Sequence, residues 1–217
     1  NDGMPAISHV GLQSGGTTAA SREITLSVLC EGAPAEYRLS EDPSFGDAAW
    51  LPYTETPGFT LSAGFGAKTL WIEVRKPLDG GGYIESEPAS FTLQRSPSLA
   101  EALNLTSGSA ASVSASPWFG QTASSRDGAA AQSGPIGNYG ATSCTLTLDG
   151  EGTVSFWWKV SSESGYDSLS VYADGAYVNG ISGLSDWAYI SQTFTGQATH
   201  TLEWRYTKDG SAVAGSD

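Results

Sequence analysis

Three aspartates at turn or terminal positions have the chemistry of cation ligands. Asp127 lies in the loop sequence 125–128, Asp167 follows a Gly-Tyr pair, and Asp217 is the last residue printed. Ca²⁺ is bound by loop carboxylates and carbonyls, so the sequence predicts a Ca²⁺ site formed by Asp127, Asp167 and Asp217. No loop has the alternating Asp/Asn pattern of a known calcium-binding loop, and solvated turn residues are the alternative.

Five aromatic side chains are candidates for a carbohydrate-binding surface. Sugar rings stack their C–H faces on aromatic planes, and neighbouring carboxylates or amides bind the hydroxyls. Trp157 opposes the apolar parity of its segment, Trp187 and Tyr189 share a parity on another segment, and Trp118 and Tyr166 fall in loops. These five residues form the predicted ligand-binding set, and packing in the core is the alternative for each tryptophan.

No combination of side chains predicts catalysis. The two histidines, His9 and His200, are expected in different domains, and the chain has no Gly-x-Ser-x-Gly elbow. A serine hydroxyl is a poor nucleophile without an oriented base. A pair of glycosidase carboxylates is recognisable only in three dimensions and stays open as an alternative. We therefore expect no catalytic residues and a protein that is not an enzyme.

The two cysteines, Cys30 and Cys144, have neither the spacing of a zinc site nor that of a redox pair. Each lies among residues typical of strands, in a different predicted domain. We therefore expect two buried thiols rather than a disulfide.

β-Strands must position these side chains. In residues 153–160 apolar side chains recur at every second position, and Trp157 falls on the opposite side. A strand with one wholly apolar face needs a second layer to cover it. We expect Trp158, together with Trp204 and Tyr206 of a later strand, in the resulting core. Abundant glycine (27 residues) and few charged residues (15%) also favour an all-β fold.

Two β-sandwich domains in tandem are expected. Alternating runs such as 24–28, separated by glycine and proline turns, predict about seven strands in a first domain of residues 1–94. A polar, proline-containing linker occupies residues 94–98. Ser98 and Glu101 then have the spacing of a capping box, which predicts a short helix.

The second expected domain spans residues 98–217. Asp-Gly pairs at 149–150 and 174–175 and an Asn-Gly pair at 179–180 lie between alternating runs. Such pairs are strong signals for tight β-hairpins. They predict a sandwich of short antiparallel strands.

The first half resembles bacterial immunoglobulin-like and fibronectin-type-III-like modules of surface proteins. The resemblance is carried by the segments 37–45, 50–53 and 68–75, and it covers residues 5–93. Such modules usually serve as spacers and sometimes as binders, so the resemblance implies that this half presents its neighbour at a distance.

The second half resembles a domain of large secreted or surface-anchored bacterial proteins, whose layout is similar to the MAM-type jelly roll and to concanavalin-like lectin sandwiches. Four segments carry the resemblance: 117–122, 131–134, 152–167 and 199–210, with Phe-Trp-Trp-Lys-Val-Ser-Ser-Glu as the most specific run. The resemblance implies one more strand after Asp217. We therefore expect this chain to be part of a larger polypeptide, with a strand from another chain as the alternative.

Charge restricts the partners. The net charge of −13 would repel nucleic acid and anionic lipid, and no stretch is long enough to insert in a membrane. The sequence favours a non-catalytic binding module of a secreted or cell-surface bacterial protein, for glycan recognition or adhesion. In the alternative, both domains are spacers or protein-docking modules beside a catalytic domain, a protease or polysaccharide-active enzyme, outside this chain.

Overall fold

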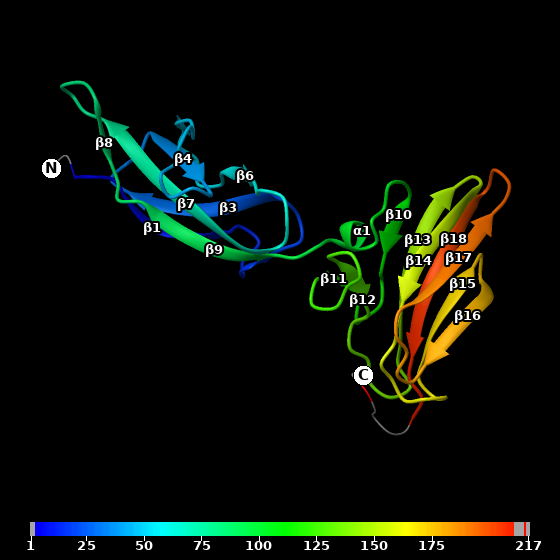
Figure 1. Cartoon of the computed structure of the whole chain (residues 1–217). Coiled ribbons are helices and arrows are strands. Elements are labelled where there is room, and N and C mark those ends of the chain that lie inside the picture. The colour runs from blue at the N-terminus through cyan, green and yellow to red at the C-terminus, as the bar shows by residue number, and fades with distance from the viewer. Residues whose placement is uncertain (1–2, 211–214, 216–217) are drawn as a thin grey trace. The chain divides into compact units, whose positions relative to one another are not determined.

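The computed structural model describes residues 3–210 and Gly215 (Figure 1). The chain divides into two compact units, Asn1–Ser96 and Pro97–Asp217. Several antiparallel sheets form a sandwich-like domain in each unit, which confirms the predicted all-β class. Within the described part of the chain, no helix has the length and apolar character needed to cross a membrane.

The first unit contains two sheets. β1 (Ala6–Leu12), β3 (Glu23–Glu31) and β6 (Gly58–Thr60) form a three-stranded antiparallel sheet. The second sheet has the order β2 (Thr18–Ala19), β9 (Ala89–Arg95), β7 (Gly66–Pro77), β4 (Glu36–Ser40) and β5 (Leu51–Pro52), and β8 (Tyr83–Glu85) also pairs with β7. Only the short pairing of β2 with β9 is parallel among the described strands.

The core of the first unit lies between its two sheets. Leu26 and Val28 of β3 are fully buried, and Leu70 and Ile72 of β7 are 1% exposed. These residues have the same parity on each strand, as expected for strands with one face in a core. Together with Leu93 of β9 they form one apolar cluster, so the two sheets pack as a sandwich.

The second unit is built around a five-stranded antiparallel sheet. Its order is β10 (Ser109–Ala111), β13 (Ala141–Asp149), β18 (Thr199–Thr207), β15 (Ser168–Ala173) and β16 (Ala176–Ser182). β14 (Gly152–Trp158) pairs with β17 (Ala188–Phe194) in a separate two-stranded ribbon, and β11 (Phe119–Gln121) pairs with β12 (Ala130–Gln132). Figure 1 shows the strands of the second unit, in which the β14–β17 ribbon overlaps the five-stranded sheet in the view.

Aromatic side chains fill the core between the ribbon and the five-stranded sheet. Trp158, Trp204 and Tyr206 are 4%, 6% and 7% exposed, as predicted. The Phe156 ring meets the Trp204 ring edge-on, with centroids 5.2 Å apart. Such an arrangement is favourable because the positive ring edge faces the negative ring face. The apolar face of β14 is therefore covered by β18.

The short helix α1 (Leu99–Ala102) begins with the predicted capping box. The backbone N–H of Glu101 donates to Ser98 Oγ at 3.2 Å, and the backbone N–H of Ser98 donates to Glu101 Oε2 at 2.9 Å. Two N–H groups that the helix cannot satisfy are thereby paired. Ala102 is the buried residue of this single turn.

The hairpin predictions were right at one of the three pairs. Asp149 and Gly150 lead from β13 to β14, which belong to different sheets and do not pair with each other. Asp174 and Gly175 join β15 to β16 with φ values of 49° and 80°, which is the conformation for which Asp-Gly is favoured. Asn179 and Gly180 instead lie inside β16. A Cβ at position 180 would lie 2.8 Å from Tyr177 Oη, so this glycine serves the close approach of a tyrosine rather than a turn.

Both cysteines are free. Cys144 is completely buried in the core of the second unit, as predicted. Cys30 is only half-buried and packs at the margin of the first core, so the expectation of full burial was wrong for this residue.

Candidate functional site

The outer face of the β14–β17 ribbon carries a strip of exposed side chains. Its members alternate with the core residues of both strands and pair across the ribbon. The pairs are Thr153–Thr193, Ser155–Ser191 and Trp157–Tyr189. The two hydroxyl pairs are hydrogen-bonded, with oxygens 3.0 Å apart in the threonine pair and 3.2 Å apart in the serine pair. We call these six residues the outer strip.

The aromatic end of the outer strip is open to solvent. Trp157 is 43% exposed and Tyr189 is 54% exposed. Their ring centroids lie 5.3 Å apart, with the ring planes inclined by 57°. The Arg126 guanidinium carbon lies 3.6 Å from the centroid of the Trp157 ring, a cation–π contact that restrains both side chains. A ligand on the strip would meet aromatic surface beside a positioned hydrogen-bond donor.

A hollow of about 930 Å³ adjoins this end of the strip, bounded by residues of β11, β12 and β14. Trp118, Trp157 and Trp187 contribute to its wall. Its polar side chains include Gln121, Arg126, Asp127, Gln132 and Lys159. The volume falls at the upper end of the usual range for small-molecule sites, about 300–1,000 Å³. Aromatic walls with a few polar groups are also typical of such sites.

The structure places the five predicted aromatic side chains in different environments. Trp157 and Tyr189 lie together in the outer strip, as required for a stacking platform. Trp187 is half-buried, and Lys159 Nζ lies 5.3 Å from its ring centroid. Tyr166 is 64% exposed on the loop before β15 but does not line the hollow.

Trp118 lies in the loop before β11, as the sequence predicted, but its side chain packs in the core. It is 9% exposed and belongs to the core cluster, so it cannot offer its ring face as an exposed platform. Its backbone N–H donates to Ser112 Oγ at 2.9 Å. This bond fixes the chain where Trp118 enters the core, a contact between loop residues that no periodicity reveals.

Arg126 is the residue of this surface that the sequence analysis missed. It lies in the loop between β11 and β12, far from Trp157 in sequence, and no local pattern links the two. The exposed hydroxyls of Thr153 and Ser155 could have been identified, because they share the parity of Trp157 on β14.

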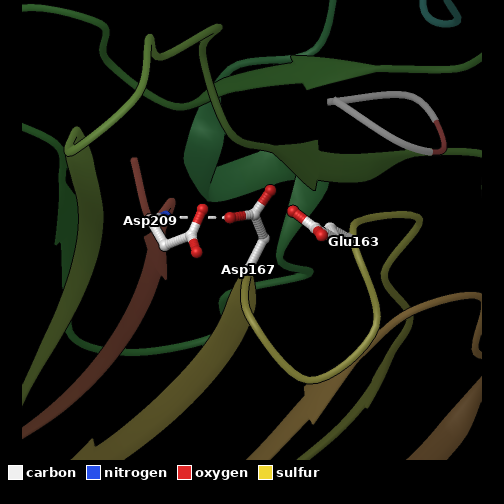
Figure 2. Close-up of side chains that lie close together, drawn as sticks. All are labelled: Glu163, Asp167 and Asp209. Atoms are coloured by element: carbon white, nitrogen blue, oxygen red, sulfur yellow. Dashed lines mark hydrogen bonds between the residues drawn. The ribbon is translucent and has the colours of Figure 1, made fainter. Parts of the chain in front are cut away.

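Three carboxylates converge at a second place in the same unit. Glu163 and Asp167 lie on the loop between β14 and β15, and Asp209 follows the end of β18. One oxygen of each side chain lies within 4.8 Å of the others, and Figure 2 shows the carboxylates turned toward one another. Asp167 Oδ1 accepts a hydrogen bond of 2.9 Å from the backbone N–H of Asp209. This acidic cluster (Glu163, Asp167 and Asp209) could hold a metal ion.

The predicted calcium ligands coincide with the acidic cluster at Asp167 alone. Asp127 does not belong to it: this residue lies on an exposed loop, where its Oδ2 accepts a hydrogen bond of 2.6 Å from Asn104. Asp217 lies outside the described residues. Asp209 comes close to Asp167 because Thr207 pairs with Ser168 across β18 and β15, a pairing that the sequence does not specify.

His200 is a packed structural residue. It is 8% exposed, its ring centroid lies 5.0 Å from that of Phe194, and its Nδ1 lies 2.8 Å from Asp174 Oδ2. Asp174 also accepts the backbone N–H of Thr201, and this bond together with His200 lowers the pKa of its carboxyl. The pair anchors the β15–β16 turn to β18.

No protein-family model matches the chain, and no curated protein matches its sequence. Among solved structures, it is similar to the secreted serine protease VesC from Vibrio cholerae at 10% identity, with a TM-score of 0.40, over 91% of this chain and 46% of that one. It is also similar to an alpha-L-rhamnosidase from Dictyoglumus thermophilum at 6% identity, with a TM-score of 0.33, over 94% of this chain and 25% of that one.

A third similar structure contains CBM51-2 in complex with GlcNAc and INT domains from Clostridium perfringens ZmpB. The identity is 12% and the TM-score 0.23, over 70% of this chain and 38% of that one. The chain spans less than half of the length of each of these three proteins.

Proposed function

We propose that this chain is a non-catalytic binding module of a secreted or cell-surface bacterial protein, and that it recognises glycans or mediates adhesion. The observation that carries the proposal is the exposure of Trp157 and Tyr189 side by side in the outer strip. Exposed rings of this size lose apolar hydration when a sugar ring stacks on them, and the sugar C–H groups complement the negative ring face.

Polar groups around the two rings supply the directional contacts that a sugar requires. The Arg126 guanidinium, which lies over the Trp157 ring, offers N–H donors, and the carboxylate of Asp127, the next residue along the chain, accepts hydrogen bonds. The hydroxyls of the outer strip can do both. A net charge of −13 with few lysines is common among secreted proteins and disfavours nucleic acid as a partner.

The test is binding of the chain to an array of bacterial and host glycans, followed by titration of the best ligand. We expect Trp157→Ala to weaken binding about tenfold or more, because truncating a central aromatic at an interface commonly costs about 2 kcal/mol. Tyr189→Ala should weaken it in the same direction.

Tyr177→Ala is the matched control. Tyr177 is 63% exposed and packs on Tyr172, but it lies on β16 in the other sheet. Its truncation should leave glycan affinity unchanged. Equal losses in the Trp157 and Tyr177 variants, or no binding to any glycan, would contradict the proposal and favour a spacer or protein-docking role.

A further inference from the structure

We propose that the acidic cluster of Glu163, Asp167 and Asp209 binds Ca²⁺, independently of any glycan. The three carboxylates come from two segments that are distant in sequence, and one oxygen of each lies within 4.8 Å of the others. Like charges at such separations repel one another, and the repulsion grows as the surroundings exclude water. A bound divalent cation turns this repulsion into attraction.

Asp167 provides the independent observation that points to a ligand. Its side chain is completely buried, and Oδ1 accepts the backbone N–H of Asp209 at 2.9 Å. The other oxygen, Oδ2, is buried without a hydrogen-bond partner. In Figure 2 the Asp167 carboxylate lies between those of Glu163 and Asp209. Buried carboxylates are normally paired or coordinate a metal, and this arrangement leaves an oxygen available for coordination.

The chemistry of the ligand atoms indicates which metal ion the cluster binds. All three side chains offer hard oxygen atoms, whereas zinc and copper sites are usually built with histidine or cysteine. Ca²⁺ takes about six to eight oxygen ligands in flexible geometry, and backbone carbonyls and water complete its shell. Mg²⁺ demands near-ideal octahedral geometry, which carboxylates from a loop and a strand end do not favour. Ca²⁺ is therefore the ion that fits best.

Calcium at this place would join separate parts of the second unit. Glu163 and Asp167 belong to the β14–β15 loop, and Asp209 continues β18. The carbonyl of Asp209 also accepts the backbone N–H of Tyr139, at 2.7 Å, which ties in the segment before β13. Binding to the folded chain alone stabilises it by mass action. The ion would act as a staple where these three segments meet.

The test uses the full chain after removal of metal with a chelator and dialysis. Addition of 5 mM CaCl₂ should raise the Tm of the second unit by about 5 °C. Isothermal titration calorimetry should give a Kd of about 10⁻⁴–10⁻³ M, the range of extracellular calcium-binding modules. Mg²⁺ at the same concentration should give a smaller shift. No Tm shift and no binding heat with Ca²⁺ would overturn the proposal, and an equal Mg²⁺ shift would overturn the choice of ion.

Two variants and one control locate the ion. Asp167→Asn and Glu163→Gln should each abolish most of the Ca²⁺-dependent Tm shift. Glu163→Gln is the safer variant, because Glu163 is only half-buried and should fold even if the Asp167 variant does not. Asp127→Asn, an exposed loop substitution outside the cluster, should keep the full shift. A full shift in the Glu163 variant, or its loss in the Asp127 variant, would show that calcium binds elsewhere.

Discussion

Trp157 and Trp158 are neighbours in sequence, yet they lie on opposite sides of β14. Trp157 is 43% exposed, whereas Trp158 is 4% exposed. Successive side chains of a strand point to opposite faces, so parity alone was enough to separate a surface tryptophan from a core tryptophan here. Trp118 lies in a loop, where the alternation of a strand does not apply. Its burial therefore follows from the three-dimensional structure and not from the sequence pattern.

The burial of the two cysteines leads to a prediction about their reactivity. Burial raises the pKa of the Cys144 thiol to about 11, so at pH 8 only about one molecule in a thousand carries the reactive thiolate. We expect Cys144 to resist alkylation in the native protein and both cysteines to react in denaturant. Mass spectrometry of the adducts, with half-buried Cys30 as internal reference, checks this. Native labelling of Cys144 at the rate of the unfolded chain would contradict the burial.

At the scale of elements, the cap of α1 can be tested directly. Ser98→Ala removes the acceptor for the Glu101 backbone N–H and should destabilise the second unit by about 1 kcal/mol, because the freed N–H loses its partner. Ser98→Thr keeps a hydroxyl and is the matched control. Urea denaturation measures both. Equal stability of the two variants would show that the capping box contributes nothing.

The sequence predicted individual helices, strands and turns better than it predicted which strands pair with each other. The capping box at Ser98 and the Asp174-Gly175 hairpin are local patterns, since the residues that interact are at most a few positions apart. The pairing of β18 with both β13 and β15 joins distant strands, and it brings Asp209 to Asp167. For this reason Asp209 was not predicted. Glu163 lies on the same loop as Asp167 and was missed although the two are close in sequence.

Across the whole molecule, charge and aromatic residues are distributed unevenly. The chain carries 23 acidic and 10 basic residues, yet the hollow beside the outer strip is lined by both Arg126 and Lys159. Each of these cations lies over the ring of a tryptophan. Local positive charge in an acidic molecule favours polar or anionic groups on a ligand at this place. The assignment of the two domains to the families that they resemble stays a prediction.

The most direct test of glycan recognition follows the indole N–H signals of the seven tryptophans by NMR. The ¹⁵N-labelled chain is titrated with the best ligand from the glycan array, and Trp157→Phe assigns the Trp157 signal. We predict that this signal shifts with the glycan while those of Trp50 and Trp71, both in the first unit, stay in place. A saturating glycan that leaves the Trp157 signal unmoved would contradict binding at the outer strip.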